Sequence, residues 1–154
     1  MRIVSFNINS VRARLHQLQA IIAKHKPDII GLQETKVHDD EYPHDAIQEM
    51  GYESYTHGQK GHYGVAILSK EKPLKIGKGF QGDNEDSQKR FIWAKFQTGK
   101  KPIFILNGYF PQGEERAHPV KFPAKKKFYR DLIKHLKIKV YHLYLLLLFS
   151  CCYC

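Results

Sequence analysis

The order of apolar and polar positions near the amino terminus predicts a β-α-β unit. Residues Arg2 to Ile8 alternate and are rich in β-branched and aromatic side chains, which is typical of a strand. Apolar residues then recur at helical spacing, at Val11, Leu15, Leu18 and Ile22.

The boundaries of this helix are also marked in the sequence. Asn9 or Ser10 is expected to cap its amino-terminal end, and Pro27 blocks its continuation. The following segment, Asp28 to Leu32, is a short apolar run of the kind seen in a strand covered on both faces. A strand, a helix and a second, covered strand in this order favour an α/β fold.

Further strands and one long helix are expected downstream. The predicted strands, separated by Gly, Pro and Asn turns, are Tyr52–Thr56, Gly64–Ser69, Leu74–Lys78, Arg90–Phe96 and Ile103–Asn107. The predicted helix runs from Ala124 to Lys137, with Phe128, Leu132, Ile133 and Leu136 on one face.

Charge narrows the class of partner. The 154 residues, enough for one domain, include 25 Lys and Arg against 15 acidic residues, a net charge of +10 and a pI near 9.5. That balance is expected where the partner is polyanionic, and nucleic acid is the first candidate. The alternative is a solvated basic surface, at residues such as Lys70, Lys72 and the run Lys125 to Lys127, that binds nothing acidic.

The last residues have a different composition from the rest. From Val140 the chain is strongly apolar, but Leu143 to Phe149 is far shorter than the roughly 20 residues that a membrane span needs. The three cysteines, Cys151, Cys152 and Cys154, lack the paired spacing of a structural metal site. We expect one domain over residues 1–137 and an aberrant apolar, Cys-rich tail over 138–154, produced by a frameshift or a premature stop.

The location expected from the sequence is the cytoplasm. No cysteine precedes residue 151, which suits a reducing compartment, and the first residues do not resemble a signal peptide. No membrane association is expected.

Polar side chains at strand ends carry the candidate chemistry. Glu34 follows the apolar run at residues 28–32 and offers a hard oxygen ligand to Mg²⁺, although a surface glutamate on a turn has the same pattern. Asn7 ends the first predicted strand and either orients a neighbouring carboxylate, binds the metal through its amide oxygen or simply forms a turn.

Several segments together resemble the exonuclease III family of the endonuclease/exonuclease/phosphatase superfamily. They are SFNIN, PDIIGLQETK, GHYGVAILSK, QKRFIWA, LNGYFPQGE and KFPAKKKFY, in the family's order and spacing over residues 1 to about 137. The resemblance implies the first half of a DNase I-like four-layer α/β sandwich, with two packed mixed sheets between helices. We expect the second sheet to be missing and the apolar face of the first sheet to be uncovered.

The resemblance also implies roles for individual residues. Glu34, with Asn7 beside it, is expected to hold Mg²⁺, with Mn²⁺ as an alternative. Tyr109 is the expected catalytic tyrosine, acting either as a phenolate or as a hydrogen-bond donor to a phosphate oxygen. The residues expected to contact DNA or its phosphates are Lys89, Arg90 and Asn107.

Two family motifs, GDxN and SDH, are absent from the sequence. The single GD pair, Gly82 and Asp83, aligns with a connecting loop, and His62 and His118 do not follow an SD pair. The resemblance implies Mg²⁺-dependent hydrolysis of duplex DNA at recessed or nicked 3′ ends and abasic sites, by a protein that is monomeric at full length. Because the two motifs are missing, we expect this chain to be inactive alone. The alternatives are a non-catalytic basic DNA-binding remnant and a small-substrate phosphatase of the same superfamily.

Overall fold

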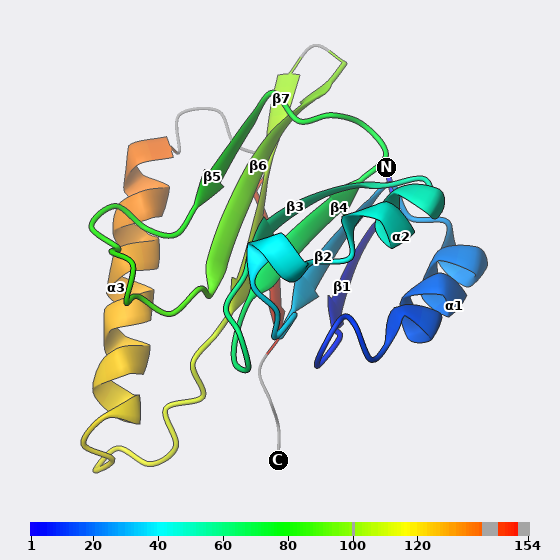
Figure 1. Ribbon diagram of the computed structural model, residues 1–154. Helices are drawn as coiled ribbons and strands as arrows, with labels where there is room; N and C mark the ends of the chain where they lie inside the picture. The colour runs from blue at the N-terminus through cyan, green and yellow to red at the C-terminus, as the bar shows by residue number, and fades with distance from the viewer. Residues whose placement is uncertain (100, 140–144, 151–154) are drawn as a thin grey trace.

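The computed structural model describes residues 1–99, 101–139 and 145–150 and arranges them in four layers (Figure 1). One four-stranded sheet has the order β1 (Ile3–Asn7), β2 (Ile29–Gln33), β4 (Val65–Ser69), β3 (Glu53–His57). The other has the order β5 (Lys75–Lys78), β6 (Phe91–Thr98), β7 (Lys101–Tyr109), β8 (Leu145–Ser150). Helices α1 (Leu15–His25) and α2 (His44–Glu49) cover the outer face of the first sheet, and α3 (Lys121–Lys139) covers the second. A short 3₁₀ helix, η1 (Asp39–Glu41), precedes α2.

Alternation along the central strands builds three apolar layers. Side chains on one face of a strand point into one layer and their neighbours point into the next. In β2, Ile29 lies between the two sheets, whereas Ile30 and Leu32 pack under the helices of the first sheet. In β6, Ile92 lies between the sheets and Trp93 packs under α3. This explains why every residue of β2 is buried, as the sequence predicted for a strand covered on both faces.

The expectation that the first sheet would be uncovered is wrong. Strands β5, β6 and β7 pair with one another in antiparallel order and form a second sheet, which lies against the first. Ile67 of β4 and Ile105 of β7 are both buried in the layer between the sheets. The strands themselves were predicted, but the sequence did not show which of them pair. Strand partners are determined by packing between distant segments, not by the local residue pattern.

The predicted cap of the first helix is also wrong. Helix α1 begins at Leu15 after Arg14, and Asn9 and Ser10 have φ values of 45° and 87° in the preceding loop. The backbone N–H of Ser10 donates to the carbonyl oxygen of Glu34 at 2.7 Å. This loop therefore binds to the segment that follows β2, and the helix starts only after it.

Helix α3 was predicted correctly in type, and it is longer at both ends than expected. Phe128 and Leu132 are buried against the second sheet, and Leu136 packs beside them. Ile133 was expected on the same face, but it is 52% exposed.

Part of the segment predicted to be an aberrant tail has a described backbone. Strand β8 pairs with β7 in parallel over Leu145 to Ser150. Cys151, Cys152 and Cys154 lie outside the described residues, and the assignment of residues 138–154 as aberrant stays a prediction. No helix in the described part of the chain is both long and apolar enough to cross a membrane.

Removing a side chain from the layer between the sheets tests this packing. Ile67 is fully buried there, so Ile67→Ala should lower the free energy of unfolding by about 2 to 5 kcal/mol through lost burial and a residual cavity. Leu74→Ala is the matched control, because Leu74 is 59% exposed, and should change stability by about 0.5 kcal/mol or less. Chemical denaturation followed by circular dichroism measures both; equal losses would contradict the packed two-sheet arrangement.

Candidate active site

The carboxyl ends of β1 and β2 form one side of the candidate site. The two strands are parallel, with Asn7 opposite Gln33, so they end at the same edge of the sheet. Glu34 follows directly and is only 8% exposed. The side-chain amide of Asn7 donates to Glu34 Oε1 at 2.7 Å, which orients the carboxylate. The structure thus brings together the two residues predicted to form the metal site.

A lysine completes a small polar ring around Glu34. Lys36 Nζ lies 3.1 Å from Glu34 Oε2 and donates to Asn9 Oδ1 at 2.5 Å. The backbone N–H of Asn9 donates to Asn7 Oδ1 at 3.1 Å, which closes the ring. A carboxylate buried this far needs a charged or hydrogen-bonded partner, and Lys36 supplies a positive charge. Sequence reasoning missed Lys36 and the role of Asn9; the lysine two residues after Glu34 in LQETK was the available signal.

Backbone hydrogen bonds hold the loops of the site together. Thr35 N–H donates to Gly64 O at 3.1 Å, and Lys36 N–H donates to Tyr63 O at 3.0 Å. Gly64 N–H in turn donates to Lys89 O at 2.9 Å. A Cβ at residue 64 would overlap the Thr35 side chain, so this close approach requires glycine. The loop at residues 59–64 is therefore fixed between the Glu34 segment and the start of β6.

Backbone strain concentrates at the same edge. The described part of the chain has seven non-glycine residues with positive φ, and five of them lie in the loops of the site: Asn9, Ser10, Glu34, Lys36 and Tyr63. Such conformations cost energy and persist where neighbouring structure enforces them, often at functional sites.

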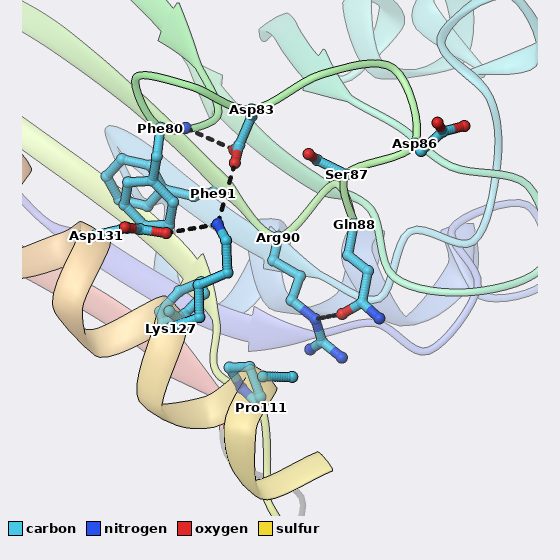
Figure 2. Close-up of a pocket in the computed structure, with 12 residues that line it drawn as sticks. Phe80, Asp83, Asp86, Ser87, Gln88, Arg90, Phe91, Pro111, Lys127 and Asp131 are labelled. Carbon is cyan, nitrogen blue, oxygen red and sulfur yellow. Dashed lines mark hydrogen bonds and ion pairs between the residues drawn. The ribbon is translucent and has the colours of Figure 1, made fainter. Parts of the chain in front are cut away.

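The ends of β6 and β7 form the second side of the site. Tyr109 is the last residue of β7, and its N–H donates to the carbonyl oxygen of Arg90 at 2.8 Å. The Arg90 guanidinium lies 4.7 Å from the centre of the Tyr109 ring, and its Nη1 donates to Tyr109 O at 3.1 Å. Its Nε donates to Gln88 Oε1 at 2.6 Å (Figure 2). The structure thus places Tyr109 and Arg90 in direct contact.

The charges of the two sides influence each other. Burial lowers the pKa of the Arg90 guanidinium, and Tyr63, Tyr109 and the carboxylate of Glu34 oppose that shift. Of these three groups, the Glu34 carboxylate has the smallest effect on the Arg90 pKa.

Asn107, predicted to contact DNA or its phosphates, lies near the end of β7 with its side chain turned inward. It is fully buried, and its amide donates to Leu32 O at 2.9 Å and to Ala66 O at 2.8 Å. Its Oδ1 accepts a 2.6 Å hydrogen bond from Gln33 Nε2. These bonds join β7 to β2 and β4 across the layer between the sheets, and they use both amide hydrogens of Asn107.

Lys89 stabilises the loop that precedes β6. Its Nζ donates to Asn84 O at 3.2 Å and to Glu85 O at 2.9 Å. Asp83, the aspartate of the single GD pair, accepts a hydrogen bond from Phe80 N–H at 2.8 Å. Figure 2 shows Lys127 of α3 reaching both Asp83 and Asp131 beside a cavity of about 260 Å³. Asp83 thus anchors this loop near α3, in agreement with its reading as a loop residue.

The two histidines set aside in the sequence do not join the site. His118 accepts the N–H of Val120 and of Lys121 at 3.2 and 3.0 Å, so it caps the start of α3. His62 is exposed in the loop before β4.

The donor set around Glu34 fits a hydrated hard cation. Mg²⁺ usually keeps several waters and takes one or two carboxylates together with substrate phosphate. Glu34 is such a carboxylate, with Asn7 orienting it and a cation, Lys36, already attracted to its second oxygen. Within residues 1–99, 101–139 and 145–150 no group of three or more His, Cys, Asp and Glu side chains gathers as a metal site.

The structure is a two-sheet α/β sandwich with polar side chains gathered at one edge of the sheets. The chain belongs to the endonuclease/exonuclease/phosphatase family, whose model matches residues 4–137. It is 56% identical over 137 residues to exodeoxyribonuclease III of Haemophilus influenzae. This match covers 89% of this chain and 51% of that protein.

Two solved structures show the same fold. An AP endonuclease from Archaeoglobus fulgidus has a TM-score of 0.81 and 34% identity, over 91% of this chain and 52% of its own. The 3′ phosphatase NExo from Neisseria, bound to a product DNA hairpin, has a TM-score of 0.83 and 34% identity, over 96% of this chain and 56% of its own. The chain spans about half the length of these relatives.

The inter-sheet role of Asn107 can be tested by stability. Asn107→Ala removes three buried hydrogen bonds and should lower the free energy of unfolding by about 2 to 3 kcal/mol. Asn84→Ala, in an exposed loop, is the control and should cost about 0.5 kcal/mol or less. Urea unfolding of both variants measures the difference. A parent-like Asn107→Ala would show that the bridge contributes nothing.

Proposed function

We propose that the chain supplies one side of the active site of a Mg²⁺-dependent DNA phosphodiesterase. The observation that carries this proposal is the buried Glu34 carboxylate, oriented by Asn7 at 2.7 Å, at the edge where Arg90 and Tyr109 also lie. The substrate would be duplex DNA with recessed or nicked 3′ ends or abasic sites. Support for this substrate class comes from the similarity to exodeoxyribonuclease III and to an AP endonuclease.

The roles of the residues follow from their charge and position. Glu34 would hold Mg²⁺ or Mn²⁺, while Asn7 fixes the direction of its carboxylate. Bound metal would offset negative charge on the phosphate oxygens during hydrolysis. Arg90 would bind a phosphate oxygen, and Tyr109 would either donate its phenolic hydrogen to phosphate or act as a phenolate beside the Arg90 cation.

Lys89 and Asn107 are proposed to act mainly through the fold. Lys89 holds the loop before Arg90, and Asn107 fixes β7 behind Tyr109. Direct contact of either side chain with DNA would require these hydrogen bonds to open.

The remaining expectations are kept as parts of the proposal. Residues 1–137 form the amino-terminal half of the family domain, residues 138–154 are an aberrant tail, and the full-length protein is monomeric and cytoplasmic. A second function, DNA binding without catalysis, is favoured by one observation, the net charge of +10. Steep salt dependence of DNA binding with no turnover would identify it.

The main experiment restores the family motifs that the sequence lacks. The 154-residue chain alone should give no Mg²⁺-dependent cleavage of a duplex with an abasic site, because the GDxN and SDH residues that would activate water are absent. Mixing it with the carboxy-terminal half of a family relative should restore cleavage. An assay of strand incision with Mg²⁺ and with chelator measures both.

Variants of the reconstituted protein separate the two sides of the site. Glu34→Gln should lower cleavage by about 10² to 10³-fold because the metal loses its charged ligand. Tyr109→Phe should lower turnover but leave the Mg²⁺ dependence unchanged, because only a phosphate contact is lost. The matched control is Glu71→Gln, at an exposed glutamate. If Glu34→Gln cleaves DNA like the parent, Glu34 is not the metal ligand and the proposed site is wrong.

A further inference from the structure

Tyr63 has an unusual backbone conformation that the proposed function does not explain. It lies in the loop before β4 with φ = 57°, between Gly61 and Gly64, which also have positive φ. A bulky side chain rarely adopts this conformation, so the surrounding contacts must enforce it. The carbonyl oxygen of Tyr63 accepts the N–H of Lys36 at 3.0 Å, which ties the loop to the Glu34 segment. This conformation directs the Tyr63 ring toward Arg90.

The three side chains of Tyr63, Arg90 and Tyr109 form a triangle. The Arg90 guanidinium lies 4.0 Å from the centre of the Tyr63 ring and 4.7 Å from that of Tyr109. The two ring centres are 6.3 Å apart and the rings are tilted by 41°. The cation therefore lies in the angle between two aromatic faces, where it is attracted to both. Tyr63 is the closer of the two rings.

Gln88 links two corners of this triangle. Its Oε1 accepts the Arg90 Nε hydrogen bond at 2.6 Å, and its Nε2 donates to the Tyr63 hydroxyl at 3.1 Å. One amide thus restrains both the guanidinium plane and the Tyr63 ring. All four side chains border a cavity of about 330 Å³ between the site and the start of α3.

We propose that Tyr63 and Gln88 are positioning residues that hold the Arg90 guanidinium against Tyr109. The guanidinium of Arg90 and the hydroxyl of Tyr109 then face one DNA phosphate at this cavity. The proposal rests on the proposed function, because it takes DNA as the ligand. An arginine on a flexible stem loses conformational freedom when it binds phosphate. Holding it in place beforehand reduces that cost and improves binding.

The first test examines the contact without DNA. In the ¹H–¹⁵N NMR spectrum of the 154-residue chain, the Arg90 Nε–H should be shifted by the ring currents of Tyr63 and Tyr109 and should exchange slowly with water. Tyr63→Leu should reduce the ring-current shift, whereas Tyr63→Phe should retain it because the ring face is kept. Gln88→Leu should speed the exchange of the Arg90 Nε–H. Circular dichroism checks that each variant is folded.

The second test examines DNA binding. The probe is a fluorescein-labelled DNA duplex with a recessed 3′ end, and the dissociation constant is measured by anisotropy. Tyr63→Leu should weaken binding about tenfold, and Tyr63→Phe should stay within about twofold of the parent. Tyr129→Leu, at a tyrosine that is 42% exposed on α3, is the control for loss of a surface ring and should bind like the parent.

A double-mutant cycle shows whether Tyr63 acts through Arg90. In an Arg90→Met background, Tyr63→Leu should cause no further loss of DNA affinity, because the cation that it positions is gone. An additive loss would overturn the proposal, since Tyr63 would then contact DNA independently.

The two readouts separate the possible failures. If the NMR shift is unchanged in Tyr63→Leu, the positioning contact does not exist and the proposal fails whatever the DNA result. If the shift is lost but DNA affinity is unchanged, the contact is purely structural and the proposal also fails. If the parent shows the shift but does not bind the duplex, the proposed function fails, and the DNA role of Tyr63 fails with it.

Discussion

The hydrogen bonds that Asn107 makes with Gln33, Leu32 and Ala66 are the constraint on which the arrangement of the site depends. The side chains of Gln33 and Asn107 point into the layer between the two sheets, where most side chains are apolar. A buried polar group is costly unless it is hydrogen-bonded, and Asn107 meets this condition where its amide reaches the carbonyl oxygens of Leu32 and Ala66. Among the described residues, Oε1 of Gln33 has no hydrogen-bond partner, so it is the bonds of Asn107 that fix where the two sheets meet. An apolar contact tolerates sliding, whereas this set of bonds does not. The bridge fixes β7 against β2 one residue away from Glu34 and two residues away from Tyr109.

The sequence predicted strands β1 to β7 and helices α1 and α3, missed η1 and α2, and made no prediction of which strands pair. The alternation in Arg2 to Ile8 and the apolar run at residues 28–32 both became strands, and every residue of β2 is buried, as expected for a strand covered on both faces. The existence of the second sheet was missed, since the pattern of β6 and β7 fits any sheet that is covered on both faces. Which strands become neighbours is determined by contacts far apart in the sequence.

The candidate site was predictable at its strand ends and not in its loops. The strand-end rule made Glu34 and Asn7 candidates, the family resemblance implied that they lie side by side, and their hydrogen bond shows that they meet. Tyr63 and Lys36 were missed because their positions depend on left-handed backbone conformations, which local residue preferences do not favour. The same cause explains the failed cap at Asn9 and Ser10: these residues serve the loop around Glu34, and the helix begins only after the loop is complete.

Strain and charge at this edge are consequences of one arrangement. Glu34 is buried, so it needs the Lys36 ammonium and the Asn7 amide, and both can reach it only if the chain turns sharply at residues 34 and 36. The carbonyl oxygen of Tyr63 and the N–H of Lys36 join that turn to the aromatic corner that holds Arg90. The Glu34 carboxylate also opposes the lowering of the Arg90 pKa by burial. The two sides of the site, built on different sheets, are thus joined by backbone hydrogen bonds, and such a preorganised arrangement is the condition for binding a ligand without reorganisation.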